Sequence, residues 1–441
     1  MQLVETDTEP SWKELYRKKL CSAQDAVQRI KSGDRVYIHS NAAAPQSLID
    51  AMVARAGELS SVQIYHLLTL GKARYAAPEF KNSFKVHALF IGPNVRSAVN
   101  QGWADYTPVF LSEIPELFLS GTLDLDVCLI QVSPPDAHGY VSYGVSVDCT
   151  IAARKRAKLV IAEVNPQMPR TLGRSFVHIS RIDHIVEVNR PLPELGLEIP
   201  SEVELAIGRN VASLVEDGAT LQLGIGTIPN AILACLRDKK ELGVHSEMLS
   251  DGIVDLIESG VITNDCKTVL PGKCAVSFVM GTRRLYDFID NNPGIEFQTS
   301  DYINDPFVIA QNYKMTAINS ALQVDLTGQV SADSIGKHLY SGFGGQVDFI
   351  RGASRSKGGK AIIAMPSTAR NESLSRIVPH IDLGGGVVTS RADVQYVVTE
   401  YGIAQLRGKN LKDRAKALIA IAHPKFREQL LSGAREFPWL G

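Results

Sequence analysis

The chain contains 441 residues, of which 45% are hydrophobic and 21% are charged, and its formal net charge at pH 7 is −1. This length is too great for one ordinary hydrophobic core, so two large domains are expected in a globular protein. Charges are spread evenly and no apolar run approaches the roughly 20 residues that cross a bilayer. These features exclude nucleic-acid-binding and membrane-spanning proteins from the expected classes.

Residues 1–13 are polar and acidic, which argues against a secretory signal and predicts a cytoplasmic protein. The cysteines show neither C-x-x-C nor zinc spacing with His, so we expect reduced thiols in the core and no metal site. They are Cys21, Cys128, Cys149, Cys235, Cys266 and Cys274.

Short β-branched runs alternate with helical stretches along the chain. Most runs are continuously apolar and are followed by Gly, Pro or Asn, which is typical of buried parallel strands. The pattern predicts strands at residues 35–39, 62–67, 86–90, 127–132, 159–163, 220–223, 267–270, 361–364 and 394–398. Helices such as residues 202–216 lie between them, which predicts an α/β fold with mostly parallel sheets and right-handed βαβ units.

Two segments, residues 27–51 and 211–234, share one order of features. Each contains a helix, a Gly turn, a strand, a loop of small residues and a second helix with Pro in its first turn. Val36 corresponds to Leu221 in this alignment. The repeat predicts two related open α/β domains.

A Pro-rich stretch at residues 189–200 is suited to a linker between these domains. We therefore expect one domain over residues 1–195 and the other over residues 196–441.

The stretch G-V-H-S-E-M-L-S-D-G, residues 243–252, contains a glutamate, Glu247, just after an apolar run. Extending the repeat aligns Ile64 with Val244 and places Leu67 opposite Glu247. Because the shared architecture accepts leucine there, folding does not require the glutamate. We interpret Glu247 as a functional residue rather than a solvated one.

Two glycine-rich stretches are candidate anion sites. L-Q-L-G-I-G-T-I-P-N, residues 221–230, joins a strand to a helix start without the dinucleotide G-x-G-x-x-G spacing. S-G-F-G-G-Q-V-D-F, residues 341–349, can present successive N–H groups to an oxyanion. A ligand-free turn explains the first equally well, and a bulge or capped turn is the alternative for the second. Arg407 and Lys409 are candidate phosphate contacts before two structural helices.

At these motifs the chain closely resembles the acetyl-CoA hydrolase/transferase family, specifically its 4-hydroxybutyrate and butyrate-type CoA-transferases. The matching stretches are G-I-G-T-I-P-N, H-S-E-M followed by D-G-I-V-D-L-I-E-S-G-V-I-T-N, G-F-G-G-Q-V-D-F, E-Y-G-I-A-Q-L-R-G-K and S-P-P-D-A-H-G-Y-V-S-Y-G-V-S-V-D. The resemblance spans nearly the whole chain. It implies two open α/β domains with the active site at their interface, coenzyme A as a substrate and no permanently bound cofactor.

By this resemblance Glu247 is the nucleophile that attacks an acyl-CoA thioester. A glutamate with an ordinary pKa of about 4.3 is ionised at neutral pH and needs no general base. Backbone amides of Gly344 or Gly345 are the main candidates for stabilising the oxyanion, with a second donor from the loop at residues 40–44. The resemblance also implies coenzyme A contacts at Gly224, Ile225, Gly226, Thr227, Ile228, Gly345, Gln346, Arg370 and Lys409.

Arg370 stands where the family commonly has lysine. Asp136 and His138 match a family motif, and we interpret them as turn and packing residues.

The implied activity is ping-pong transfer of coenzyme A from a short-chain acyl-CoA to a carboxylate such as acetate, through a glutamyl-CoA thioester, by a homodimer or higher oligomer. An acyl-CoA hydrolase would use the same residues with water as the acceptor. A non-catalytic sensor of coenzyme A or sugar phosphates is the alternative from another class.

Overall fold

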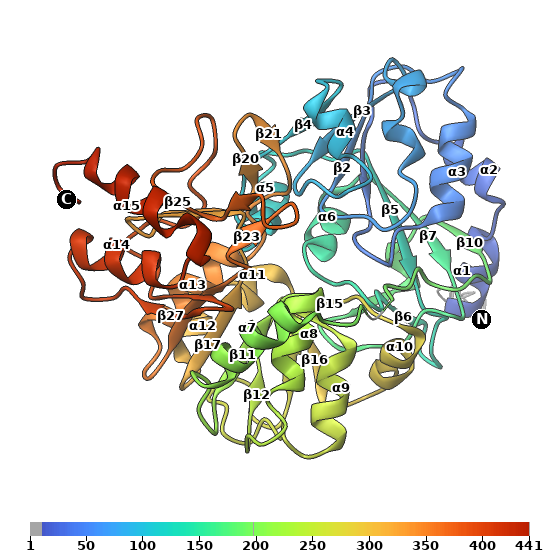
Figure 1. Ribbon diagram of the computed structural model, residues 1–441. Helices are drawn as coiled ribbons and strands as arrows, with labels where there is room; N and C mark the ends of the chain where they lie inside the picture. The colour runs from blue at the N-terminus through green and yellow to red at the C-terminus, as the bar shows by residue number, and fades with distance from the viewer. Residues whose placement is uncertain (1–10, 197, 441) are drawn as a thin grey trace, which may run out of the picture.

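The structure is a computed structural model that describes residues 11–196 and 198–440. Its two halves each contain a large sheet, and they lie side by side in Figure 1, the first in blue to teal and the second in green to red. We call the units around these sheets the N-terminal and the C-terminal domain.

The first sheet has seven strands, and all of them are parallel. Its strand order is β10 (His184–Glu187), β7 (Leu159–Val164), β5 (Val127–Val132), β1 (Arg35–Ile38), β2 (Val62–His66), β3 (Phe84–Ala88) and β4 (Ala104–Tyr106). The helices of this half are α1 (Trp12–Lys19), α2 (Ala23–Val27), α3 (Gln46–Ala54), α4 (Arg96–Asn100), α5 (Ile114–Leu119) and α6 (Thr150–Arg156). All six residues of β5 are buried, as expected of a central parallel strand.

The second sheet has six strands, and its edge strand β27 is antiparallel to β26. Its strand order is β12 (Gly243–Val244), β11 (Thr220–Leu223), β17 (Met315–Asn319), β22 (Lys360–Ala364), β26 (Tyr396–Thr399) and β27 (Gly402–Gln405). The helices are α7 (Glu202–Ala212), α8 (Thr227–Ala234), α9 (Asp251–Glu258), α10 (Arg283–Ile289), α11 (Ser300–Ile303), α12 (Pro306–Gln311), α13 (Gln346–Arg355), α14 (Leu411–Ala420) and α15 (Arg427–Arg435). The expected α/β fold with mostly parallel sheets is confirmed.

Short strands complete the two halves. They are β6 (Tyr140–Ser142), β8 (Leu172–Gly173), β9 (Phe176–His178), β13 (Met248–Leu249), β14 (Cys274–Val276), β15 (Phe278–Val279), β16 (Ile295–Phe297), β18 (Gln323–Asp325), β19 (Val330–Ser331), β20 (Ser334–Ile335), β21 (His338–Leu339), β23 (Thr368–Ala369), β24 (Leu374–Ser375) and β25 (Ile377–Val378). Single 3₁₀ turns occur at Arg74–Ala76, Pro78–Phe80, Ile179–Arg181 and Pro424–Phe426. Strand β8 of the first half pairs with β16 of the second, so the halves are interlocked as well as adjacent.

The two large sheets repeat one arrangement. The order β2-β1-β5-β7-β10 in the first corresponds to β12-β11-β17-β22-β26 in the second. Val36 pairs with Ile64 in the first sheet, and Leu221 pairs with Val244 in the second. Because these pairs match, Leu67 and Glu247 occupy equivalent places three residues further along. The connection between the sheets runs from Glu187 to Thr220 and contains the predicted linker.

Several predicted element positions differ from the structure. The strand expected at residues 86–90 lies two residues earlier, at Phe84–Ala88. Residues 267–270 form a loop rather than a strand, because Lys267 turns inward and its Nζ donates to the Val244 carbonyl at 2.7 Å. The helix expected to reach residue 216 ends at Ala212, and the strand expected from residue 394 begins at Tyr396.

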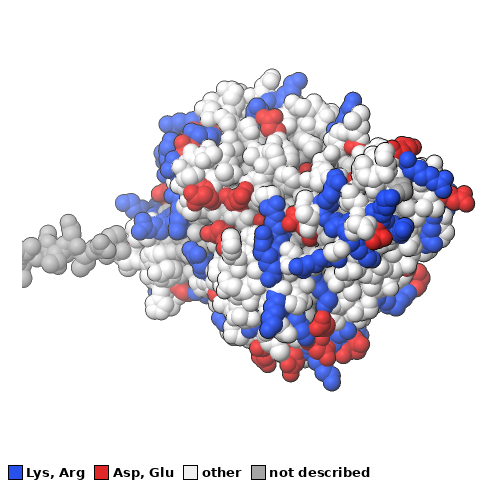
Figure 2. Space-filling model, turned by 90° about the vertical axis from the view of Figure 1, so that its left-hand side faces the viewer, with Lys and Arg blue, Asp and Glu red and all other residues white. Residues whose placement is uncertain are grey.

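The cysteines are free thiols, and Cys128, Cys149 and Cys274 are buried. Cys266 is exposed, so the predicted core position is wrong for this residue. Within residues 11–196 and 198–440, no group of three or more His, Cys, Asp or Glu side chains is placed to hold a metal ion. None of the helices in these ranges has the length and apolar character that a bilayer crossing requires. Basic and acidic side chains lie beside one another over the face shown in Figure 2.

The equivalence of Leu67 and Glu247 can be tested by measuring how much Leu67 contributes to stability. Leu67 is 4% exposed and packs in the main core, so Leu67→Ala is expected to lower the free energy of unfolding by about 2–5 kcal/mol. Leu119→Ala is the matched control, because Leu119 is 48% exposed and should change stability by no more than about 0.5 kcal/mol. Urea denaturation measures both. Equal effects of the two substitutions would contradict the assignment of Leu67 to the core.

Candidate active site

Neighbouring chain segments hold the backbone of Glu247 on both sides. The amide of His245 continues the pairing of β12 by donating to the Leu221 carbonyl at 3.0 Å. The carbonyl of Glu247 accepts the amides of Ser277 and Phe278, each at 3.0 Å. The residue therefore leaves the carboxyl edge of the second sheet with little freedom of its main chain, which is where α/β folds place their ligand sites.

The carboxylate of Glu247 is partly buried and has two donors. Asn304 Nδ2 donates to Oε2 at 2.8 Å, and the backbone N–H of Gly345 also donates to the carboxylate. Burial raises the pKa of Glu247 to about 7, although the bonds from Asn304 and Gly345 oppose the shift. Burial thus favours the protonated form of Glu247, in contrast to the ordinary ionisation expected from the sequence.

His245 is a positioning residue rather than a base. Its Nε2 lies 2.9 Å from the Ile303 carbonyl, which only accepts, so Nε2 carries the proton. Burial, together with the charge of Lys267, lowers the pKa of His245 to about 3 and keeps the ring neutral. Because Ile303 directly precedes Asn304, this bond helps to hold the amide that contacts Glu247.

Sequence reasoning missed the role of Asn304. It is the C-cap of the four-residue helix α11, and it carries no motif. His245 lies inside the H-S-E-M motif, so the sequence could have marked it as a candidate site residue. Its hydrogen-bond partner, the Ile303 carbonyl, is known only from the structure.

The Gly344–Gly345 turn lies against the side chain of Glu247, the closeness that the sequence analysis expected. Gly344 adopts a left-handed conformation with φ +53°, and Gly345 is the N-cap of α13. A Cβ atom on Gly345 would overlap both Glu247 Oε2 and Asn304 Nδ2. Gln346 is mostly buried and its Nε2 donates to Thr389 Oγ1 at 3.2 Å, so its amide is not directed at Glu247.

Residues 224–226 form the turn between β11 and α8 on the same edge of the sheet, and Thr227 and Ile228 begin α8. Gly226 has φ +108° and caps α8 without a side-chain bond, and Ile225 and Gly226 are exposed. A cavity of about 250 Å³ lies here, lined in part by Ile225, Gly226, Ser250 and Met280. Ser246 Oγ donates to the Leu223 carbonyl at 3.1 Å and ties this turn to the segment of Glu247.

Two of the predicted coenzyme A contacts, Arg370 and Lys409, lie at different edges of the sheet. Arg370 is exposed with φ +50° and follows β22 at the carboxyl edge, the edge of Glu247. Lys409 follows β27, whose last residue Gln405 pairs with Tyr396 at the start of β26. Because β27 is antiparallel, it returns the chain to the amino edge, and the structure does not bring Lys409 to Glu247.

The loop at residues 40–44 does not present a row of free donors. The amides of Asn41, Ala43 and Ala44 pair inside the N-terminal domain with carbonyls of Leu68, Ser40 and Asn41. The expected second oxyanion donor from this loop is therefore not one of these three amides, and the expectation stays a prediction for the rest of the loop.

Asp136 is a turn residue, as expected. Its Oδ1 accepts the amides of His138 and Tyr140, each at 2.9 Å, and its Oδ2 accepts Arg170 Nη2 at 2.7 Å. His138 itself is exposed.

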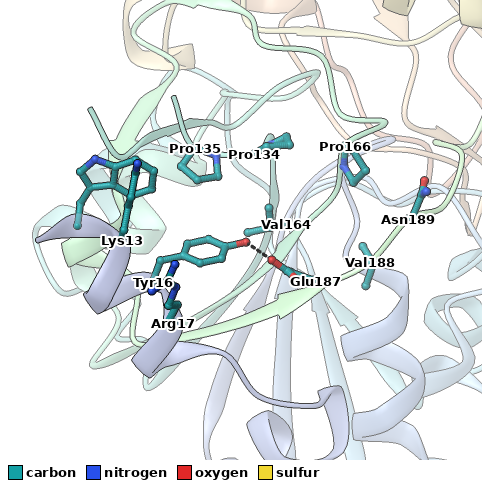
Figure 3. A pocket seen from close by; sticks show the side chains of 11 residues that line it. Lys13, Tyr16, Arg17, Pro134, Pro135, Val164, Pro166, Glu187, Val188 and Asn189 are labelled. Atoms are coloured by element: carbon teal, nitrogen blue, oxygen red, sulfur yellow. Dashed lines mark hydrogen bonds between the residues drawn. The ribbon is translucent and has the colours of Figure 1, made fainter. Parts of the chain in front are cut away.

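A larger cavity of about 670 Å³ lies beneath α1 in the N-terminal domain (Figure 3). Tyr16 Oη donates to Glu187 Oε1 at 2.9 Å across it, and burial and this bond raise the pKa of Tyr16 above its ordinary value. The carboxylate in its lining, Glu187, has the Tyr16 hydroxyl as its donor, and the described residues of the lining include no glycine whose amide could approach a reacting group closely. Chemistry rather than size therefore favours the Glu247 site.

Comparisons with known proteins agree with these features. The acetyl-CoA hydrolase/transferase N-terminal domain matches residues 2–194, and the C-terminal domain of the same family matches residues 281–434. The chain belongs to the acetyl-CoA hydrolase/transferase family. The resemblance inferred from the motifs is confirmed.

Several relatives match along nearly their whole length. A 4-hydroxybutyrate coenzyme A transferase of Clostridium kluyveri is 54% identical, over 96% of this chain and 98% of that protein. A butyryl-CoA:acetate CoA-transferase of Anaerostipes caccae is 37% identical, over 97% and 98%. The crystal structure of a 4-hydroxybutyrate CoA-transferase from Porphyromonas gingivalis superimposes with a TM-score of 0.84 at 44% identity, covering 97% of this chain and 100% of that one.

Substitution of Gly345 tests the close approach to the nucleophile. Gly345→Ala is expected to displace Glu247 or Asn304 and to lower kcat/KM by at least about 100-fold, while the circular dichroism spectrum is retained. Gly57→Ala is the control, because a Cβ there meets nothing within 4 Å. A Gly345→Ala enzyme with near-normal activity would contradict this geometry.

The raised pKa of Glu247 predicts a stability effect with a defined sign. Protonated Glu247 is favoured in the folded state, so between pH 4.5 and about 7 stability from this group falls as pH rises. Glu247→Gln is therefore expected to raise the free energy of unfolding at pH 8 by on the order of 2 kcal/mol, with a smaller effect at pH 5. Urea denaturation at both pH values measures this, with the exposed Glu79→Gln as the control. A gain that is equal at both pH values would refute the assignment.

Proposed function

We propose that this protein transfers coenzyme A from a short-chain acyl-CoA, of the 4-hydroxybutyryl or butyryl type, to a carboxylate such as acetate. The observation that carries the proposal is the partly buried carboxylate of Glu247, held by Asn304 and the Gly345 amide in a chain of this family. The names of the relatives from Clostridium kluyveri and Anaerostipes caccae support these substrates.

The proposed first half-reaction moves coenzyme A onto the protein. A carboxylate oxygen of Glu247 attacks the thioester carbon, the C–S bond breaks, and coenzyme A leaves as a thiolate. The thiolate then attacks the glutamyl carbonyl of the mixed anhydride. This expels the donor acid as its carboxylate and leaves a glutamyl-CoA thioester.

The second half-reaction reverses these steps with a new acid. The acceptor carboxylate attacks the glutamyl thioester and releases the thiolate, which attacks the acyl carbonyl of the new anhydride. Acyl-CoA leaves and the Glu247 carboxylate is regenerated. Atoms and electron pairs balance without a metal, a redox cofactor or water.

Several features of the site support these steps. Burial removes water from Glu247, which makes the ionised form more basic than an exposed glutamate. The Gly345 amide already donates to the carboxylate, and an amide in this position can contribute roughly 3 kcal/mol to oxyanion stabilisation. Ile225 and Gly226 are exposed at the turn proposed to contact coenzyme A, and the exposed Arg370 is the proposed contact for a remote phosphate. Binding energy from those remote groups can force the reacting atoms together.

The alternative is an acyl-CoA hydrolase, in which water attacks the same intermediates. We also propose that the protein is cytoplasmic and forms a homodimer or a higher homo-oligomer. Sedimentation of the purified chain tests the oligomeric state directly.

Covalent trapping tests the nucleophile. Incubation with butyryl-CoA followed by borohydride is expected to reduce the glutamyl thioester to an alcohol at residue 247, identified by peptide mass spectrometry. Glu247→Ala should show no modification and less than about one-thousandth of normal turnover, because the covalent route is lost. An unmodified residue 247 in the wild-type protein would sink the mechanism.

Acceptor dependence separates transferase from hydrolase. Turnover of butyryl-CoA is expected to require acetate and to form acetyl-CoA in equal amount. Release of free coenzyme A at the same rate with and without acetate would establish the hydrolase instead.

A further inference from the structure

A second buried carboxylate, Asp348, lies beside the site and has no part in the transfer steps. It stands three residues after Gly345 in the first turn of α13, and it is 3% exposed. Burial raises the pKa of Asp348 to about 7, and the negative charge of Glu247 contributes to the shift. A charged group so near the nucleophile influences its ionisation, because repulsion between two carboxylates acts on both.

The partners of Asp348 belong to the other domain. Ser112 lies between β4 and α5 of the N-terminal domain, and its Oγ donates to Asp348 Oδ1 at 2.9 Å. The amide of Ser112 donates to Oδ2 at 3.2 Å. The preceding amide, Leu111, donates to the Gly344 carbonyl at 3.1 Å. Two adjacent residues of one domain thus hold the catalytic turn of the other on both sides of Gly345.

Acylation of Glu247 changes the electrostatics of this contact. The charged groups that act on Asp348 are Glu247 and Glu113, and both are negative. When Glu247 becomes an anhydride or a thioester it loses its charge, so Asp348 ionises more readily. Hydrogen bonds to an ionised carboxylate are roughly twice as strong as those to a neutral group, so the bonds from Ser112 strengthen at the same time.

We propose that Ser112 and Asp348 form a latch between the two domains that tightens when Glu247 is acylated and thereby keeps water from the covalent intermediate. Both are positioning residues, since neither is assigned a contact with the reacting atoms. The inference rests on the proposed function, because that function neutralises Glu247. It also gives a physical basis for the choice between transfer and hydrolysis.

The lifetime of the thioester tests the latch. The glutamyl-CoA form of the full-length protein is prepared with butyryl-CoA, freed of small molecules and followed by intact mass without any acceptor acid. The thioester of Ser112→Ala and of Asp348→Asn is expected to hydrolyse at least about threefold faster than that of wild type, because each substitution weakens the bonds between Ser112 and Asp348. With acetate present, the ratio of hydrolysis to transfer should rise by the same factor in both variants.

Two further variants serve as controls for this measurement. Ser112→Thr keeps both donors and should restore the wild-type lifetime. Ser120→Ala removes an exposed hydroxyl bond to the Glu116 carbonyl within the N-terminal domain, and it should behave as wild type. Unchanged lifetimes in both Ser112→Ala and Asp348→Asn would overturn the latch.

Hydrogen exchange provides a readout that does not depend on turnover. Glu247→Gln removes the charge without forming the covalent bond, so exchange of the Ser112 amide at pH 7 should slow by at least about threefold. In the Asp348→Asn background the same substitution should leave exchange unchanged. Equal slowing in both backgrounds, or no slowing in either, would refute the coupling.

The two hypotheses fail in different ways. Absence of any thioester in the wild-type protein overturns the proposed function. A thioester that forms normally but has the same lifetime in all variants overturns the latch alone.

Discussion

The site depends on one interaction, the contact of the desolvated Glu247 carboxylate with Asn304 Nδ2 and the Gly345 amide. A carboxylate removed from water is unfavourable unless donors replace the solvent, and two donors replace it only in part here, as the raised pKa of Glu247 shows. The surrounding features serve this contact. Bonds to the backbone of Glu247 fix its position, His245 holds the residue before Asn304, and only glycine at position 345 allows the main chain to approach so closely.

The repeated architecture explains why such a residue can be tolerated. The two sheets share strand order and register, yet their buried carboxylates stand at different strands. In the N-terminal domain Glu163 on β7 is fully buried, and its Oε1 accepts the amide of Leu48 at 2.7 Å in the first turn of α3. The register of β5 with β7 and of β17 with β22 makes Ala364 its counterpart. The carboxylate of Glu163 therefore accepts a hydrogen bond from the first turn of a helix, whereas the donors that bind Glu247 can also stabilise an oxyanion.

Much of this arrangement could be predicted from local sequence, because buried parallel strands and glycine turns have patterns of their own. The repeat also located Glu247, since an apolar counterpart at Leu67 marks a carboxylate that folding does not need. What could not be predicted depends on distant partners. Asn304 is 57 residues from Glu247, and Ser112 is 236 residues from Asp348. The edge at which Lys409 lies could not be predicted, because a single antiparallel strand sends the chain to the far edge of the sheet and hydrophobic pattern alone does not give strand direction.

Contacts between the domains place the catalytic turn as firmly as its own sheet does. Asn100 on α4 exchanges hydrogen bonds with the backbone of Leu339 in β21, at 2.8 and 3.0 Å, a few residues before Gly342. Phe90 and Tyr106 pack against Gly342, and Leu111 and Ser112 follow at Gly344 and Asp348. In Figure 1, α5 of the N-terminal domain meets α11 of the C-terminal domain beside this segment. Because Glu247 belongs to one domain and residues of the other position the glycine turn beside it, separation of the domains would displace the Gly345 amide from the carboxylate and admit water. Under the proposed mechanism, the balance between transfer and hydrolysis then depends on how tightly the domains meet, since the same residue attacks in both reactions.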